Sequence, residues 1–174
     1  MRKMVKRAVY AGSFDPVTKG HLWIIEQAAQ LFNHLIIAIG ENATKSYSFD
    51  IKTRLDLLRK VTKQYKNVEV SHFHNQFLIH YAAQVKAQYI IRGIRNVNDY
   101  EYEKGMRHIN SDISKDITTI FLMPPRGVAE ISSSLVNGLV GSDQWENIVT
   151  KYVPPVVVKQ MIKLHQSNQV SQVK

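Results

Sequence analysis

The chain of 174 residues contains no cysteine, which excludes disulfide bonds, cysteine-ligated zinc sites and catalysis by a thiol. It also lacks an apolar run long enough to span a membrane, and no signal-peptide core follows the basic N-terminus. We therefore expect a soluble, cytoplasmic protein that does not associate with membranes.

Acidic residues are few compared with basic ones. The chain has 23 Lys and Arg residues against 14 Asp and Glu residues, and the formal net charge is +9. Such a surface favours anionic partners, including nucleotides and nucleic acids. The basic residues are scattered and form no stripe with interleaved aromatic side chains, which argues against a nucleic-acid-binding or regulatory protein without catalysis. That reading nevertheless stays open as an alternative.

Short apolar runs rich in β-branched residues alternate with stretches of helical periodicity. The predicted strands are residues 8–11, 35–39, 68–70, 89–91 and 118–123. The predicted helices are residues 22–32, 51–65, 78–86, 100–110, 133–140 and 155–165. This order predicts an α/β fold, a Rossmann-like, doubly wound, five-stranded parallel sheet with helices on both faces. We expect one domain over residues 1–174, with a frayed polar tail at residues 167–174.

The segment after the first predicted strand, residues 10–21, combines several features of a phosphate-binding turn. Gly12 permits a tight turn, and Ser13 can donate its hydroxyl to a phosphate. Gly20 clears space so that His21 projects from the first turn of the following helix. Helices that start at the carboxyl ends of parallel strands offer backbone N–H groups to anions. A histidine alone at this place would be read as a surface residue, but the combination of Gly12, Ser13, Gly20 and His21 is far more specific than a single histidine.

Two further segments lie at the ends of predicted strands. Arg92 and Arg95 frame a glycine after the fourth strand, and guanidinium groups suit the geometry of phosphate oxygens. The run Ile-Ser-Ser-Ser at residues 131–134 opens a helix, where serine either caps the helix or binds phosphate. Alone, each segment has an ordinary structural reading. Together with residues 10–21 they point to a nucleotide.

In these three segments the chain resembles the phosphopantetheine adenylyltransferases, a family of HxGH nucleotidyltransferases, with Thr18 in place of the motif's first histidine. The resemblance implies a Rossmann-like fold and a homohexamer built as two trimers. It implies transfer of the adenylyl group of ATP to 4′-phosphopantetheine, which yields dephospho-coenzyme A and pyrophosphate in coenzyme A biosynthesis. It also implies Mg²⁺ bound through the ATP phosphates, and inhibition by coenzyme A.

The resemblance also implies roles for individual residues. The residues implied in catalysis are His21, Lys45 and Arg95. The residues implied in binding the acceptor are Ser13, Lys45, Leu78 and Arg92. The residues implied in binding ATP are Ser13, Phe14, His21, Gly93, Ile94, Arg95, Glu103, Val128, Ala129, Glu130, Ile131, Ser132, Ser133 and Ser134. No residue is implied as a direct metal ligand.

Some positions depart from the usual pattern of that family. They are Gln76, His80, Asn137 and Gly138, and we expect them to alter the wall of the acceptor pocket. An alternative is therefore another HxGH-type nucleotidyltransferase with a different phosphate acceptor, such as an NMN adenylyltransferase or a cytidylyltransferase. Those enzymes usually keep a histidine at the position of Thr18, and the segments at 92–95 and 131–134 resemble them less.

Overall fold

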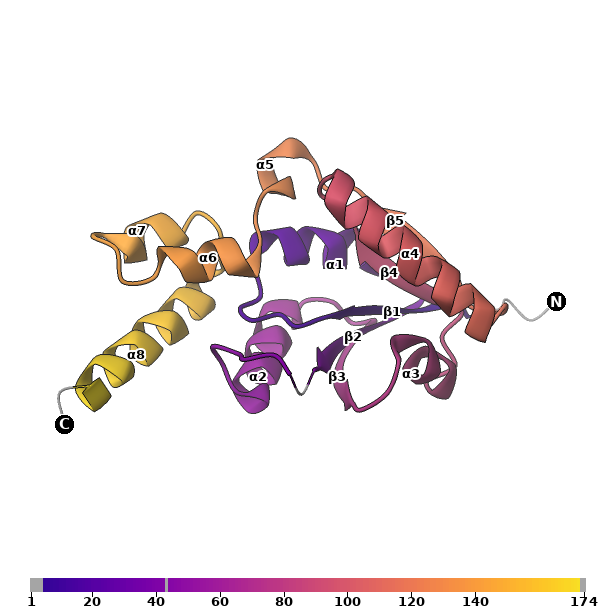
Figure 1. Ribbon diagram of the computed structural model, residues 1–174, viewed down its shortest axis with the longest axis horizontal. Helices are drawn as coiled ribbons and strands as arrows, with labels where there is room; N and C mark the ends of the chain where they lie inside the picture. Colours follow the sequence, from indigo (N-terminus) through magenta and orange to yellow (C-terminus); the bar gives the residue numbers. More distant parts are fainter. Residues whose placement is uncertain (1–4, 43, 173–174) are drawn as a thin grey trace.

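The computed structural model describes residues 5–42 and 44–172, and within these ranges five parallel strands form one sheet (Figure 1). The strands are β1 Arg7–Gly12, β2 His34–Glu41, β3 Val68–His74, β4 Tyr89–Gly93 and β5 Thr118–Leu122, in the spatial order β3-β2-β1-β4-β5. All four pairings are parallel. The predicted sheet is confirmed.

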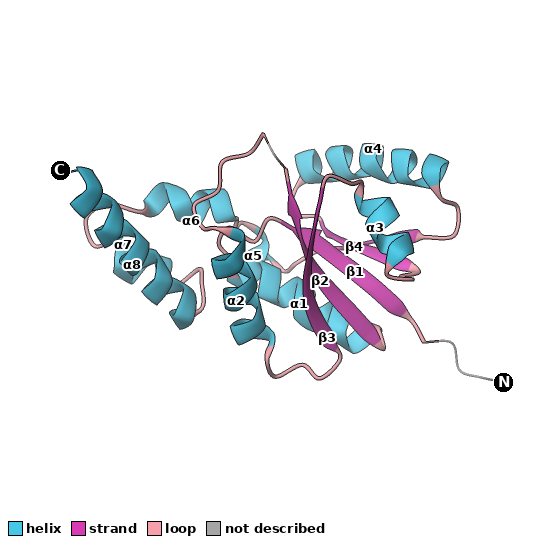
Figure 2. Ribbon diagram, turned by 90° about the horizontal axis from the view of Figure 1, so that it is seen from below, coloured by secondary structure: helices cyan, strands magenta, loops and turns pink. Residues whose placement is uncertain are grey.

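Helices cover both faces of the sheet. The helices are α1 Lys19–Leu31, α2 Ile51–Thr62, α3 Leu78–Gln84, α4 Val97–Ile113, α5 Arg126–Ala129, α6 Ser133–Leu139, α7 Trp145–Val149 and α8 Pro155–Gln172. Helices α1 and α2 lie on one face, and α3 and α4 lie on the other (Figure 2). Helices α6, α7 and α8 gather at one end of the molecule, where α8 packs against α2 (Figure 1). No helix in the described part of the chain is both long and apolar enough to cross a membrane.

The strands contribute to two apolar cores because their side chains alternate between faces. In β1, Ala8 and Tyr10 pack into the core beneath α1 and α2, whereas Val9 and Ala11 pack into the core beneath α3. The residues of β2 alternate in the same way. A central strand buried on both sides reads as a continuous apolar run, which is why the sequence predicts these strands well.

Local signals set most helix starts. The Asp50 carboxylate accepts a hydrogen bond from the Thr53 N–H at 2.7 Å, which confirms the predicted cap of α2, and α8 begins at Pro155 as predicted. Helix α8 continues to Gln172, past its predicted end at residue 165, because no glycine or proline interrupts it. The sequence predicts neither α5 nor α7, because helices this short show no apolar period.

Strand β1 marks the point at which the chain reverses its direction across the sheet. Val9 lies opposite Ile36 of β2 and also opposite Ile90 of β4. From β1 the chain proceeds to β2 and β3 on one side, and it then returns to add β4 and β5 on the other. Ligands of open parallel sheets bind at such a reversal, outside the carboxyl ends of the strands. In this chain those ends are Gly12 and Gly93.

Two glycines of this fold should respond in opposite ways to substitution by alanine. A Cβ at Gly20 would lie 2.9 Å from the Ile131 carbonyl oxygen, whereas a Cβ at Gly105, inside α4, would meet nothing within 4 Å. We expect Gly20→Ala to lower the free energy of unfolding by about 1–3 kcal/mol through overpacking. We expect Gly105→Ala to raise it by about 0.5–1 kcal/mol through helix propensity. Urea unfolding of both variants tests this, and a Gly20→Ala protein as stable as wild type would contradict the close packing.

Candidate active site

Two pockets adjoin at the carboxyl ends of β1 and β4. The first, here named the Lys45 pocket, has a volume of about 320 Å³, and the second, the His21 pocket, has a volume of about 260 Å³. The residues that line both are Ala11, Gly12, Ser13, Arg92 and Glu103. The two pockets therefore meet at the turn after β1 and at the end of β4, where the topology favours a ligand site.

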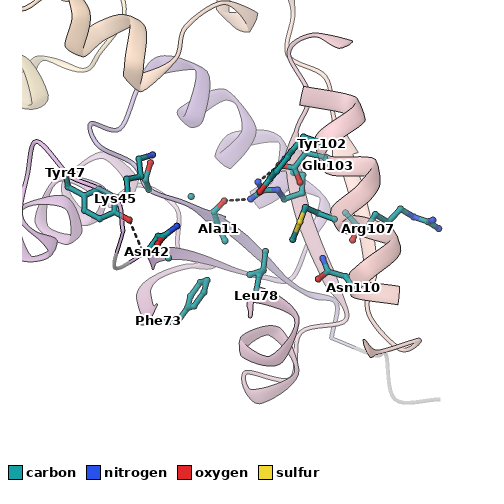
Figure 3. Close-up of a pocket in the computed structure, with 16 residues that line it drawn as sticks. Ala11, Asn42, Lys45, Tyr47, Phe73, Leu78, Tyr102, Glu103, Arg107 and Asn110 are labelled. Atoms are coloured by element: carbon teal, nitrogen blue, oxygen red, sulfur yellow. Dashed lines mark hydrogen bonds and ion pairs between the residues drawn. The ribbon is translucent and has the colours of Figure 1, made fainter. Parts of the chain in front are cut away.

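The Lys45 pocket has walls of mixed character (Figure 3). Lys45 and Tyr47 come from the loop after β2, and Leu78 comes from the first turn of α3. Helix α4 lines the opposite side with Arg107 and Asn110. Apolar surface thus lies beside cationic and amide groups. This combination suits an elongated ligand with an anionic end.

The His21 pocket is bordered by the starts of two helices and by the end of β4. His21 lies in the first turn of α1, the serines of residues 132–134 open α6, and Arg95 follows β4. Helix starts carry a partial positive charge and unsatisfied N–H groups. With the guanidinium groups of Arg92 and Arg95 nearby, the pocket is built to receive a polyanion.

The Thr18 backbone holds the His21 ring in one tautomer. The Thr18 N–H donates to Nδ1 of His21 at 3.0 Å, so Nδ1 is the acceptor nitrogen and the ring hydrogen resides on Nε2. The Thr18 hydroxyl oxygen in turn accepts from the His21 N–H at 3.3 Å and caps α1. Burial, with a further contribution from the charge of Arg95, lowers the pKa of His21 to about 4. At neutral pH, His21 is therefore an uncharged hydrogen-bond donor.

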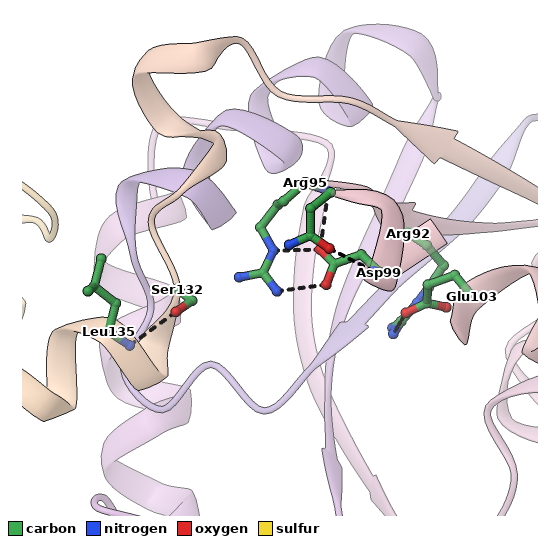
Figure 4. A network of polar contacts seen from close by, with 7 residues as sticks. Arg92, Arg95, Asp99, Glu103, Ser132 and Leu135 are labelled. Carbon is green, nitrogen blue, oxygen red and sulfur yellow. Dashed lines mark hydrogen bonds and ion pairs between the residues drawn. The ribbon is translucent and has the colours of Figure 1, made fainter. Parts of the chain in front are cut away.

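The two arginines of the site are each held by a carboxylate of α4 (Figure 4). The Arg95 Nε and Nη2 atoms lie 2.7 and 3.0 Å from the two oxygens of Asp99. Hydrogen bonding by Arg95 lowers the pKa of Asp99, so this carboxylate stays ionised. Arg92 pairs with Glu103 and donates through Nη1 to the Ala11 carbonyl at 2.8 Å. Both guanidinium groups are thus oriented before any ligand arrives.

Two serines at the start of α6 already have structural partners. The Ser132 hydroxyl oxygen accepts from the Leu135 N–H at 3.0 Å and caps the helix. The Ser133 hydroxyl donates to the Pro16 carbonyl at 2.8 Å, which joins α6 to the turn after β1. Ser134 is exposed at the pocket wall. Both readings of the serine run, helix capping and exposure toward a ligand, therefore apply, but to different residues.

Comparison with known proteins identifies the family. Residues 9–138 match the family described as cytidylyltransferase-like. The phosphopantetheine adenylyltransferase of Chromobacterium violaceum is 52% identical over 161 residues, which cover 92% of this chain and 98% of that protein. The phosphopantetheine adenylyltransferase of Neisseria meningitidis serogroup B is also 52% identical, over 92% of this chain and 95% of that protein. The chain belongs to the phosphopantetheine adenylyltransferase family. It is a nucleotidyltransferase, as its sequence motifs predict.

The fold is shared more widely than this family. A solved structure of Plasmodium falciparum nicotinic acid mononucleotide adenylyltransferase complexed with NaAD superposes with a TM-score of 0.69 at 17% identity. The match covers 92% of this chain and 96% of that one. At such low identity the likeness shows the Rossmann-like fold alone, and the family assignment rests on the curated relatives.

Most residues that the sequence assigns to the site line one of the two pockets. Those in the Lys45 pocket are Ser13, Lys45, Leu78, Arg92 and Glu103. Those in the His21 pocket are Ser13, His21, Arg92, Gly93, Arg95, Glu103, Val128, Ile131, Ser132, Ser133 and Ser134. Phe14, Ile94, Ala129 and Glu130 line neither pocket. Phe14 and Ile94 are instead buried, and the Phe14 ring lies edge-on to His21 with 5.0 Å between the centroids.

The expected change in the acceptor wall has no counterpart in the structure. None of Gln76, His80, Asn137 and Gly138 lines the Lys45 pocket. The Asn137 amide instead donates to the Asp15 carbonyl at 2.9 Å and supports the turn after β1 from the side of α6. The prediction fails here because closeness to a motif in the sequence does not decide which side chains meet in space. The order of strands and helices decides it.

Some lining residues have no assigned role among the predicted site residues, although their spacing carries a signal. Met106, Arg107 and Asn110 follow Glu103 at spacings of three, four and seven, which place them on one face of α4. Asp99 lies four residues after Arg95, the spacing of a helical ion pair. Tyr47 carried no such signal, because an irregular loop has no period.

The protonation of His21 can be followed directly by NMR. In the protein without ligand we expect the Nε2–H tautomer to persist down to about pH 5, because burial holds the pKa near 4. ATP should raise that pKa, since phosphate charge favours the imidazolium form. The Arg95→Met variant should also raise it, whereas Arg59→Met, at an exposed position of α2, should not. An imidazole that gains its proton near pH 6.5 without ligand would contradict this account.

Proposed function

We propose that this chain transfers the adenylyl group of ATP to 4′-phosphopantetheine, forming dephospho-coenzyme A and pyrophosphate in coenzyme A biosynthesis. The observation that carries the proposal is the junction of the two pockets at Ser13 and Arg92. A transfer between two substrates needs two adjoining pockets whose reactive ends share one wall. The 52% identity to proteins named phosphopantetheine adenylyltransferase supports this choice of substrates.

ATP is proposed to bind in the His21 pocket. Its triphosphate would lie across the starts of α1 and α6, where helix dipoles and N–H groups favour negative charge. Arg95 is already oriented by Asp99 and would contact the β- and γ-phosphates. Ser134 offers an exposed hydroxyl on the same wall.

Phosphopantetheine is proposed to bind in the Lys45 pocket. Its phosphate would meet Lys45 and Arg92 at the end nearest Ser13. Its arm would extend along Leu78 and toward Asn110 of α4, which can pair with an amide of the ligand. Coenzyme A carries the same arm, so we propose that it competes for this pocket.

The reaction follows from these positions as one in-line displacement. An oxygen of the acceptor phosphate forms a bond to the α-phosphorus of ATP, while the bond from that phosphorus to the α,β-bridging oxygen breaks. The electron pair departs with pyrophosphate, and no proton must be removed because the acceptor phosphate is already an anion. The Nε2–H of His21 and the ammonium group of Lys45 would stabilise the crowded α-phosphate, and Arg95 would stabilise the leaving pyrophosphate.

Mg²⁺ is proposed to arrive with ATP, held by phosphate oxygens. The acidic side chains of the His21 pocket, Asp99 and Glu103, are each engaged by an arginine. Residues 5–42 and 44–172 contain no group of three or more His, Asp or Glu side chains placed to hold a metal. When bound, the ion would offset the charge that develops on pyrophosphate.

We also propose that the protein is a cytoplasmic homohexamer. Large apolar side chains of α4 are exposed, among them Val97 at 74%, Tyr102 at 65% and Ile109 at 50%. Met123, directly after the edge strand β5, is 72% exposed. Large apolar side chains that stay exposed in this way suit contact with further copies of the chain.

A pyrophosphate-release assay with ATP and a panel of acceptors tests the proposed function. Phosphopantetheine should support rapid release, whereas nicotinamide mononucleotide and glycerol phosphate should support little, because neither fills the apolar part of the Lys45 pocket. Release with another acceptor alone would point to a different nucleotidyltransferase. Failure with every acceptor, together with a salt-dependent gel shift of nucleic acid, would favour the non-catalytic alternative.

A further inference from the structure

Arg54 of α2 is a buried cation outside the set of residues assigned to either substrate. Its side chain is 1% exposed. Its Nη1 donates to the Ser13 carbonyl at 3.1 Å, and its guanidinium carbon lies 4.0 Å from the centroid of the Tyr47 ring. Its Nη2 lies 3.5 Å from a carboxylate oxygen of Glu41, the last residue of β2. One side chain therefore contacts the turn after β1, the end of β2 and the loop that carries Lys45.

These contacts satisfy the buried guanidinium only in part. The contact with Glu41 is long, and among the described residues the buried Nε of Arg54 has no hydrogen-bond partner. Removing a charge from water is costly unless it is fully paired, so an apolar side chain would serve helix packing at a lower cost. Packing alone does not account for an arginine here. Two of the groups that it touches, in contrast, Ser13 and Tyr47, line the Lys45 pocket.

A second contact joins the same turn to the same loop. The Asp15 carboxylate accepts hydrogen bonds from the Ser48 N–H at 2.6 Å and from the Phe49 N–H at 2.9 Å. Arg54 and Asp15 thus hold the loop at two adjacent points, Tyr47 and Ser48–Phe49. Within the loop, the Tyr47 hydroxyl accepts from the Asn42 N–H at 2.9 Å. Lys45 projects from the short span between these anchored residues.

We propose that Arg54 is a positioning residue that holds the loop of residues 44–50, here named the Lys45 loop, against the turn after β1 that contains Ser13. Through this contact, the ammonium group of Lys45 and the hydroxyl of Ser13 are set at the separation that the acceptor phosphate requires. This inference rests on the proposed function, in which both groups meet that phosphate. The His21 pocket includes no residue of the Lys45 loop, so loss of Arg54 should impair acceptor binding more than ATP binding.

Calorimetric titration of the Arg54→Met variant with phosphopantetheine and, separately, with ATP tests the inference. Methionine keeps much of the volume and removes the donors and the charge. We expect acceptor affinity to fall about tenfold or more, since a small misplacement of a binding group is costly, and ATP affinity to change by less than about twofold. The control is Arg59→Met, the same exchange at an exposed position of the same helix, which should bind both ligands as wild type does.

A purely structural role would lower the unfolding temperature of Arg54→Met while leaving the ratio of the two affinities unchanged, and that result would overturn the inference. If Arg54→Met does not fold, Arg54→Lys keeps the buried charge but lacks the planar guanidinium that faces the Tyr47 ring and donates to the Ser13 carbonyl. It should show the same selective loss, and wild-type acceptor affinity in this variant would also overturn the inference. A wild-type protein that binds ATP but not phosphopantetheine would instead overturn the proposed function, and this inference with it.

Discussion

The parallel pairing of β1 with both β2 and β4 is the constraint on which the rest of the structure depends. It brings the turn after β1 next to the end of β4, although about 80 residues separate them in the chain. Ser13 and Arg92 become neighbours in this way, and each lines both pockets. The helices that start at this edge then add His21 and the serine run. Without the reversal of strand order at β1, the site would consist of unrelated loops.

Electrostatic groups in the site are arranged before a ligand binds. Asp99 and Glu103 orient the two arginines, and the Thr18 N–H fixes the His21 tautomer. Preorganised donors lower a barrier because they need no reorganisation as charge develops. The uncharged imidazole of His21 is part of the same preorganisation. Close to Arg95, a second full positive charge would be unfavourable until the phosphates of ATP arrive.

The sequence predicts the sheet and most of the site for physical reasons. Strands buried on both faces appear in the sequence as continuous apolar runs. Glycine, histidine and arginine residues at the strand ends recur at spacings that indicate a ligand site. Other features depend on contacts that no spacing encodes. Ser133 binds the distant Pro16 carbonyl, Phe14 is buried behind His21, and Arg54 reaches Tyr47 across the loop. The sequence does not predict the place of Asn137 for the same reason, because its partner, the Asp15 carbonyl, lies far away in the chain.

In the proposed reaction, both substrates occupy adjoining pockets and the adenylyl group passes directly between them. The stereochemical course at the α-phosphorus distinguishes this direct transfer from a route through an intermediate. With one diastereomer of ATP that carries sulfur on the α-phosphate, and with an isotopic label on the acceptor phosphate, the product's configuration can be determined. A single in-line displacement predicts inversion at the α-phosphorus. Retention would require an intermediate on the protein and would contradict direct transfer across the junction at Ser13 and Arg92.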